Sequence, residues 1–271
     1  MTATTLVPTM LAALCDEQFG RPRDVSMLRL IIHGGAPIAT ETIRRGHAAF
    51  ANAELMNIYG ATETSPIATV LPHGERLLDA PQARSCGQPA VGVEVRVIDL
   101  TTGAPAPTGT VGEIAIRGEN VMAGYWNKPD ATAAALAGGW YRSGDLGYMD
   151  ERGFLYLVDR AKDMIVSGGE NVYSTEVEEV LYGHEAVLEA AVFGIPDPRW
   201  GEAVHAVVVP RAPVDELELL RHCRASIAEY KVPKRIELRS EALPKSGAGK
   251  LLKRELRAPY WAGHEAMIAG A

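Results

Sequence analysis

The order of apolar segments between residues 27 and 60 constrains the fold of this chain more than any other feature. Residues 27–33 (MLRLIIH) form an apolar run that ends at Gly34-Gly35, which predicts a strand. Residues 40–50 begin with a threonine cap and carry apolar side chains along one side, which predicts a helix, and residues 55–58 predict the next strand. A strand, a helix and a strand at this spacing indicate a parallel βαβ unit, whose binding loops follow the carboxyl ends of the strands.

The apolar pattern changes twice after this unit. Between residues 87 and 159 it alternates with a period of two, which predicts an antiparallel sheet or small barrel with strands at 93–98, 111–117 and 154–158. After residue 159 the pattern is typical of a compact α+β domain. Its predicted parts are a Gly168-Gly169 turn, a helix that opens at Thr175 with Glu178 completing a capping box, strands at 187–195, 203–209 and 236–238, and a helix at 215–228.

The predicted fold class is therefore α/β plus α+β. Residues 1–159 contain a partial parallel αβ unit (27–60) and an antiparallel β-barrel-like subdomain (87–159), and residues 160–271 form a small α+β domain. An apolar stretch at residues 6–15 has no basic leader, contains Pro8 and is too short to span a bilayer. We interpret it as a buried helix, not an export signal, and predict no transmembrane segment.

Charge and cysteine content narrow the class of function. The formal net charge of -7 argues against a nucleic-acid partner, because affinity for a phosphate backbone rests on clustered Lys and Arg. A small-molecule substrate is therefore expected. Cys15, Cys86 and Cys223 lie far apart and form no CxxC pair, which suggests neither a zinc site nor a disulfide framework and fits a cytoplasmic location.

Four polar clusters carry side chains that suit nucleotide chemistry. Residues 59–64 (YGATET) follow a predicted strand and could stack a base, donate to a phosphate and hold Mg²⁺ through Glu63. Residues 140–145 (WYRSGD) are placed at another strand end, and Asp145 could accept hydrogen bonds from both hydroxyls of a ribose. The others are residues 159–163 (DRAKD) and 244–250 (PKSGAGK), and the second of these lacks the spacing of a Walker A loop. Taken singly, each cluster is more typical of an ordinary polar loop, turn or linker.

Together and in this order, the clusters resemble the adenylate-forming (AMP-binding) enzymes, which include acyl-CoA synthetases, luciferase-like proteins and the adenylation domains of peptide synthetases. The resemblance covers nearly the whole chain and includes IYGATETS, VGEIAIRG, GYWNKP, GGWYRSGDLG, DPRWGEAV, YKVPKRI and LPKSGAGKLLKREL. The segment GGENVYSTEVE is most similar to the acyl-CoA synthetase branch.

The resemblance implies a role for each candidate residue around the nucleotide. Tyr59, beside Gly60, would pack on adenine, Thr62 would contact the α-phosphate and Glu63 would bind Mg²⁺. Asp145 and Arg160 would hold the ribose hydroxyls. By the same resemblance, Gly34, Gly35 and Ala36 would line the adenine and acyl region. Lys250 would be the catalytic lysine that bridges carboxylate and phosphate.

The resemblance also implies a second step that uses residues after 160. Lys162 matches the family's hinge, about which a small mobile domain turns after adenylation. The turn would bring Gly168, Gly169 and Trp200 to the coenzyme A arm. The implied function is an ATP-dependent ligase that joins a carboxylate, first of all a fatty acid, to coenzyme A, with ATP, Mg²⁺ and CoA as cofactor and co-substrates.

One family element is missing from the 271 residues: the Ser/Thr/Gly-rich loop ending in Pro-Lys-Gly that wraps the β and γ phosphates. The chain begins at a stretch that resembles the middle of a full-length enzyme. We therefore expect a truncated reading frame, a split-gene remnant or a subunit that needs a separate amino-terminal half. Catalysis by the chain alone is not expected, and residues 1–158 are expected either to be poorly stable alone or to associate with another partner. A nucleotide-binding remnant, and an adenylation module that charges a carrier-protein thiol, remain as alternatives.

Overall fold

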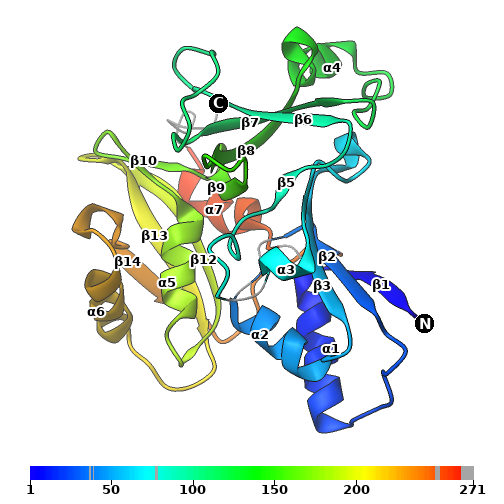
Figure 1. Cartoon of the computed structure of the whole chain (residues 1–271). Helices are drawn as coiled ribbons and strands as arrows, with labels where there is room; N and C mark the ends of the chain where they lie inside the picture. The colour runs from blue at the N-terminus through cyan, green and yellow to red at the C-terminus, as the bar shows by residue number, and fades with distance from the viewer. Residues whose placement is uncertain (37, 39, 77–78, 248–250, 264–271) are drawn as a thin grey trace. The chain divides into compact units, whose positions relative to one another are not determined.

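The structure is a computed structural model that describes residues 1–36, 38, 40–76, 79–247 and 251–263 (Figure 1). The chain divides into two compact units, Met1–Leu157 and Val158–Ala271, and each is described by itself. No helix in the described ranges has both the length and the apolar run that a membrane span requires.

The first unit begins with a mixed five-stranded sheet in the order β1-β2-β3-β4-β5. Strands β1, β2 and β3 are parallel, and helices α1 and α2 connect them in turn, so the predicted βαβ unit is confirmed. The apolar stretch at residues 6–15 was only partly interpreted correctly, because it ends one strand and begins a helix at Pro8. The elements are β1 (Ala3–Leu6), α1 (Pro8–Gly20), β2 (Leu30–Gly34), α2 (Thr40–Ala49), β3 (Glu54–Tyr59), η1 (Thr62–Thr64), β4 (Thr69–Leu71), α3 (His73–Arg76) and β5 (Gln88–Pro89).

The core of this part lies between the sheet and its two long helices. Leu11 and Cys15 of α1 and Ile43 of α2 are buried against Ile31 and Leu55 of the central strands. The helical spacing of these apolar side chains puts them on the sheet-facing sides of α1 and α2. This packing holds β2 and β3 in place, and with them the loops that follow the two strands.

The second sheet of the first unit has four strands in the order β6-β7-β8-β9, and β6–β7 and β7–β8 are antiparallel. The barrel-like expectation is corrected here, because β6 and β9 lie at opposite edges of an open sheet. Alternate side chains of β7, Ile114 and Ile116, are buried with Tyr141 and Leu155. The elements are β6 (Val93–Ile98), β7 (Gly112–Gly118), α4 (Pro129–Ala135), η2 (Ala137–Gly139), β8 (Tyr141–Met149) and β9 (Leu155–Arg160).

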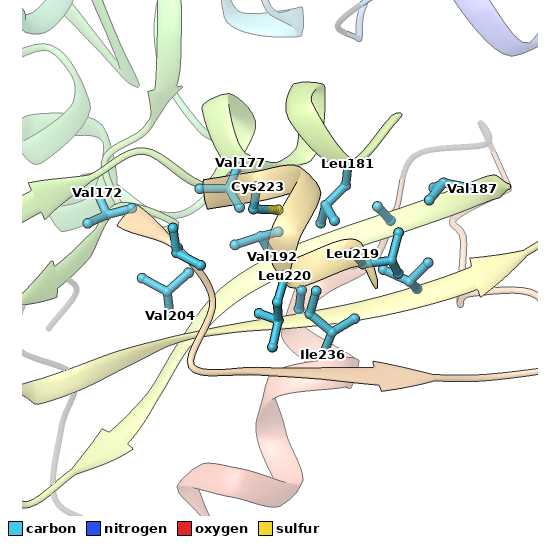
Figure 2. Packing of buried hydrophobic residues seen from close by; sticks show 14 of the residues in the cluster. Val172, Val177, Leu181, Val187, Val192, Val204, Leu219, Leu220, Cys223 and Ile236 are labelled. Carbon is cyan, nitrogen blue, oxygen red and sulfur yellow. The ribbon is translucent and has the colours of Figure 1, made fainter. Parts of the chain in front are cut away.

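The second unit is built on a sheet in the order β11-β10-β13-β12, with β14 parallel to β13. Val192 and Val204 point to the face covered by α5 and α6, where Leu181 and Leu219 meet them (Figure 2). Their neighbour Phe193 points to the opposite face and packs with residues that include Leu256 of α7. Both faces are therefore buried. The elements are β10 (Ile165–Ser167), β11 (Glu170–Val172), α5 (Ser174–Tyr182), β12 (Val187–Asp197), β13 (Gly201–Pro210), α6 (Glu216–Ser226), η3 (Glu229–Lys231), β14 (Arg235–Leu238) and α7 (Lys253–Trp261).

The predicted capping box of α5 is wrong. The Thr175 hydroxyl donates to the carbonyl of Val158, so it does not cap its own helix. The Glu178 carboxylate accepts from the backbone N–H of Val192 at 2.7 Å and lies 2.8 Å from Nζ of Lys253. Both side chains therefore serve contacts with other parts of the second unit.

The last helix, α7, contains Pro259, which has no N–H to donate to the preceding turn. Side chains hold its last turn to the sheet instead. The Tyr260 hydroxyl donates to Glu237 Oε2 at 2.6 Å, and the Trp261 indole N–H donates to the Gly194 carbonyl at 3.0 Å.

Candidate functional site

The loop after β3 is compact and closed by its own hydrogen bonds. The hydroxyl of Thr64 accepts from the Ala61 N–H at 2.9 Å and donates to the Ala61 carbonyl at 3.0 Å. A Cβ added to Gly60 would lie 2.0 Å from the Pro66 carbonyl oxygen, so only glycine fits there. The loop therefore presents Thr62, which is exposed, and Glu63, which is half-buried, in a defined shape.

Tyr59 at the end of β3 and Asp145 are brought together although 86 residues separate them. The Tyr59 hydroxyl donates to Asp145 Oδ2 at 2.8 Å, and Tyr59 is 8% exposed. Burial raises the pKa of the Tyr59 phenol far above its usual range, and the nearby Asp145 carboxylate adds to the rise. Tyr59 is therefore a neutral donor that orients Asp145 without cancelling its charge.

Asp145 lies inside β8, not after a strand, so the expected strand-end position of this cluster is wrong. The pairing of β7 with β8 shifts register between Glu113 and Ala115, and Gly144 has φ of +71°. The Ser143 hydroxyl donates to the Ile114 carbonyl at 2.8 Å and accepts from the Asp145 N–H at 3.1 Å. This local irregularity of the strand sets the direction of the Asp145 side chain.

Two tyrosines surround Glu63. The Tyr125 hydroxyl donates to Glu63 Oε1 at 2.7 Å, and this bond raises the pKa of Tyr125. Burial raises the pKa of Tyr141, and the Glu63 carboxylate adds to the effect. Mg²⁺ in nucleotide sites takes one or two carboxylates and completes its shell with phosphate oxygens and water. A single half-buried carboxylate fits that donor set, although the described residues contain no group of three or more candidate metal ligands.

Gly34 is the last residue of β2 and pairs with Ile58 near the end of β3, and Gly35 and Ala36 follow it. A Cβ on Gly34 would lie 2.3 Å from the Ile58 carbonyl oxygen, and Gly35 has φ of +80°. Both positions therefore require glycine for structural reasons. Ala36 is half-buried.

The remaining candidates belong to the second unit. Arg160 and Lys162 both have exposed side chains, and the carbonyl of Lys162 accepts from Arg257 Nη1 at 3.1 Å. Lys250 lies outside the described residues.

Gly168 and Gly169 form the turn between β10 and β11, with φ of +62° and +87°, and the predicted turn is confirmed. The Gly168 N–H donates to the Trp200 carbonyl at 2.8 Å, and a Cβ on Gly168 would lie 2.7 Å from the Trp200 ring. The aromatic ring thus covers the turn, and Trp200 itself is 37% exposed, with Arg199 4.6 Å above its ring.

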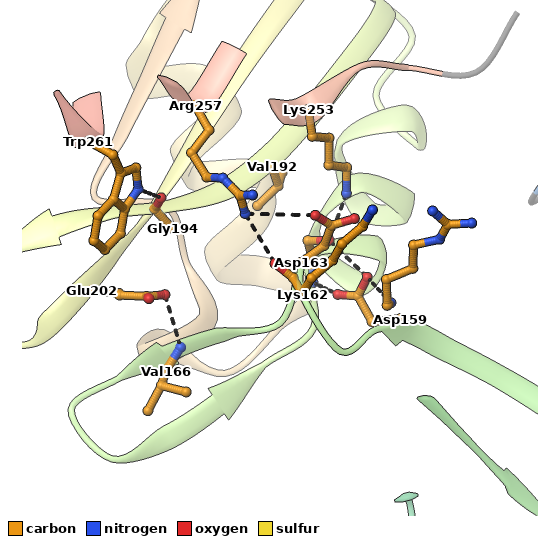
Figure 3. A network of polar contacts seen from close by, with 12 residues as sticks. Asp159, Lys162, Asp163, Val166, Val192, Gly194, Glu202, Lys253, Arg257 and Trp261 are labelled. Atoms are coloured by element: carbon orange, nitrogen blue, oxygen red, sulfur yellow. Dashed lines mark hydrogen bonds and ion pairs between the residues drawn. The ribbon is translucent and has the colours of Figure 1, made fainter. Parts of the chain in front are cut away.

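The sequence did not indicate a role for some polar residues that the structure shows in hydrogen bonds or ion pairs. Tyr125 is part of the quoted GYWNKP segment, and Tyr141 lies in GGWYRSGDLG, but neither was assigned a contact. Asp159 and Lys253 are part of a buried network of charges in the second unit (Figure 3). An aspartate or lysine with little exposed surface has no signature in the sequence, since its burial depends on distant residues.

Comparisons with known proteins agree on one family. Residues 1–126 match the AMP-binding enzyme family, and residues 176–250 match the AMP-binding enzyme C-terminal domain. A feruloyl-CoA synthase from Amycolatopsis sp is 45% identical over 93% of this chain and 50% of its own length. The fatty acid–[acyl-carrier-protein] ligase ScoC from Streptomyces coeruleorubidus is 39% identical over 96% of this chain and 50% of its own length.

Solved structures give the same result. The amide bond synthetase McbA from Marinactinospora thermotolerans superposes with a TM-score of 0.87 at 36% identity, covering 96% of this chain and 52% of McbA. The o-succinylbenzoate coenzyme A synthetase MenE from Bacillus subtilis, in complex with ATP and magnesium ion, superposes with a TM-score of 0.82 at 35% identity, covering 94% of this chain and 51% of MenE. The chain thus spans about half the length of the relatives it matches.

Proposed function

The chain belongs to the AMP-binding enzyme family, and we propose that it serves a ligase that activates a carboxylic acid with ATP and transfers the acyl group to coenzyme A. The observation that carries the proposal is the Tyr59–Asp145 pair: Tyr59, a buried neutral donor at the end of the parallel strand β3, orients the carboxylate of Asp145. Vicinal hydroxyls of a ribose donate to a carboxylate held in this way.

The first step would be attack of the substrate carboxylate on the α-phosphorus of ATP. A bond forms between the carboxylate oxygen and phosphorus, the bond to the pyrophosphate oxygen breaks, and an acyl adenylate results. Tyr59 would lie on the adenine, Thr62 would donate to the α-phosphate and Lys250 would lie between the two anions. Mg²⁺ bound through Glu63 would supply further positive charge to the phosphates.

The second step would be attack of the CoA thiol on the acyl carbonyl, with AMP as the leaving group. The hinge for this step would be Lys162. Rotation about it would withdraw Lys250 from the active site and bring the Gly168-Gly169 segment there instead. The Trp200 ring fills the space at Gly168, and the absence of a side chain at Gly169 would leave room for the pantetheine arm next to it. We propose a fatty acid as the first substrate to test, and aromatic acids second because of the feruloyl-CoA synthase relative.

Two measurements test the proposal on the chain as it is. Binding of AMP, followed by calorimetry, tests the nucleotide site, and hydroxamate formation from ATP, hydroxylamine and a panel of fatty and aromatic acids tests adenylation. Asp145→Ala is expected to weaken AMP binding at least about tenfold, since a hydrogen bond to a charged group contributes about 1.5–3 kcal/mol. Asp99→Asn, which alters a turn carboxylate of the same sheet, is the matched control and should bind AMP as the parent chain does.

The results separate the alternatives. AMP binding that is insensitive to Asp145→Ala rejects the assignment of the site. If the chain binds AMP but forms no hydroxamate, a polypeptide carrying the amino-terminal half of a relative is added. Hydroxamate formation that is restored in this way supports a split ligase, and its continued absence supports a binding remnant. Transfer to a phosphopantetheinylated carrier protein instead of CoA supports the second candidate function, which the relation to ScoC favours.

A further inference from the structure

Strand β8 contains a bulge that has no regular partner on β7. Glu113 of β7 pairs with Leu146, and Ala115 pairs with Arg142. Residues 143–145 of β8 therefore lie together opposite a single residue of the neighbouring strand (Figure 1). The backbone of this bulge cannot follow the regular hydrogen bonds of the β7–β8 ladder, so side chains have to supply partners for it. The last residue of the bulge is the proposed ribose acceptor.

Glu113 binds the bulge at two points through its two carboxylate oxygens. Its Oε1 accepts from the Gly144 N–H at 3.2 Å, and its Oε2 accepts from Nε of Arg142 at 2.9 Å. Nη2 of Arg142 also donates to this Oε2. The Glu113 side chain is 16% exposed, so these bonds are partly shielded from water. Glu113 thus holds the residues on both sides of Ser143.

Ser143 lies between these two points and fixes the rest of the bulge. Its hydroxyl donates to a carbonyl of β7 at 2.8 Å and accepts from the Asp145 N–H at 3.1 Å. Gly144 has φ of +71°, a conformation that glycine adopts without strain. The carboxylate of Asp145 then accepts from the Tyr59 hydroxyl at 2.8 Å. The contacts of Glu113 therefore hold the backbone from which the Asp145 side chain projects.

We propose that Glu113 positions the Asp145 carboxylate for the ribose by holding the bulge of β8. Glu113 acts through the backbone of Gly144 and through Arg142, so it is a positioning residue. A carboxylate that accepts from both hydroxyls of a ribose must lie within hydrogen-bond distance of both, and displacement of its backbone weakens these bonds. The inference rests on the proposed function, which assigns Asp145 to the ribose. An ion pair that only joined two strands would stabilise the sheet without affecting ribose recognition.

Calorimetry with AMP and with 2′,3′-dideoxy-AMP tests the proposal, because the analogue lacks both ribose hydroxyls. The dissociation constant of the analogue divided by that of AMP measures recognition of the hydroxyls, and a loss of folded protein leaves this ratio unchanged. Glu113→Ala is expected to lower the ratio at least about fivefold, because hydrogen bonds to a charged group are strong and depend on geometry. Glu113→Gln keeps an acceptor for the Gly144 N–H and should give a ratio between those of Glu113→Ala and the parent chain.

Glu94→Ala is the matched control, since Glu94 of β6 forms a comparable ion pair on the same sheet and accepts from Arg117 at 2.9 Å and 2.6 Å. This change removes an ion pair between neighbouring strands but leaves the bulge intact, so the ratio should equal that of the parent chain. A parent ratio in folded Glu113→Ala overturns the proposal, as does an equal fall in Glu94→Ala. If Glu113→Ala does not fold, Glu113→Gln is judged by the same two criteria.

A measurement without ligand separates this inference from the proposed function. The unfolding free energy lost in Tyr59→Phe, measured in urea, reports how well the Asp145 carboxylate is placed for the Tyr59 hydroxyl. In the Glu113→Ala background this loss is expected to fall by at least about half, since a double-mutant cycle detects coupling between residues that act on one group. Additive losses overturn the positioning role even if the chain binds no AMP. Coupled losses in a chain that does not distinguish AMP from the analogue reject the ribose assignment alone.

Discussion

Asp145 in β8 is half-buried and Asp159 in β9 is buried, and different kinds of partner hold the two carboxylates. Asp145 is held by a neutral phenol hydroxyl and a local serine turn. Asp159 is held by two N–H groups, a serine and, through that serine, the ammonium of Lys253. The bond from Tyr59 thus joins the Asp145 carboxylate to a neutral donor, whereas the contacts of Asp159 lead through Ser174 to a cation with little exposed surface.

The largest effect that tests this comparison is expected from Lys253→Met. Loss of the ammonium takes the cation of Lys253 away from Asp159 and Glu178, and breaking one side of a buried pair costs about 3–5 kcal/mol. Urea unfolding monitored by circular dichroism measures the change. Lys231→Met should cost no more than about 1 kcal/mol, because its partner Glu176 is more exposed. Equal losses of unfolding free energy in the two variants would show that the Lys253 ion pair stabilises the fold no more than the exposed Lys231 pair.

A smaller effect is expected from acid, through His205 beneath α7. His205 is 2% exposed, and burial lowers its pKa, with Arg235 and Arg239 adding to the decrease while Glu237 opposes it. The unfolded chain therefore takes up a proton first. The stability that His205 contributes is complete above its unfolded pKa of about 6.5 and is lost as the pH falls toward the lower pKa of the folded state.

Urea unfolding at pH 7.5 and pH 5.5 should show this loss in the parent chain and a reduced loss in His205→Asn. The pH dependence of stability would then belong to His205. The neighbouring Tyr260 phenol does not titrate in this range, because burial and Glu237 raise its pKa to about 12. The same pH dependence in His205→Asn would assign the acid sensitivity to other groups.

A further effect, below that of Lys253→Met, is expected from Tyr59→Phe, which removes the hydrogen bond that the neutral phenol donates to the Asp145 carboxylate. The expected cost is about 1.5–3 kcal/mol of unfolding free energy, measured in urea, together with weaker AMP binding because Asp145 loses its orienting donor. Tyr125→Phe removes a more exposed bond to Glu63 and should leave stability nearly unchanged. A loss for Tyr59→Phe as large as that for Lys253→Met would erase the difference between the two aspartates.

Periodicity predicted many of the elements, including the short strand at 236–238, but it missed β8 and α7 as well as several short strands. The strand at 93–98 has the same bounds in the structure, because alternate residues of an antiparallel sheet face opposite sides. Strands β4 and β5, with three residues and two, are too short to show a pattern that repeats every two residues and were not predicted. Strand β1 was not predicted separately from the apolar stretch that continues as α1, because its four residues before Pro8 show no pattern of their own.

The candidate site was predicted as a set of residues but not as a set of contacts. The YGATET and WYRSGD segments indicated Tyr59 and Asp145, yet their hydrogen bond joins positions 86 apart and depends on an irregularity within β8. Glu178 satisfied the sequence rule for a capping box, but the N–H of Val192 and the ammonium of Lys253 offer its carboxylate better-buried partners. Tertiary contacts of this kind override a local rule wherever a side chain is buried.

The fluorescence of Trp261, which follows Pro259 in α7, reports whether the last turn of this helix is docked on the sheet. The proline interrupts the backbone ladder just before Tyr260 and Trp261, so the environment of the Trp261 indole depends on its bond to Gly194 and not on the helix that carries it. Undocking of the last turn would move this indole into water and shift its fluorescence to the red, while the far-ultraviolet signal of the helices stayed constant. Trp126, which is 89% exposed, already emits from water and would contribute little to such a shift.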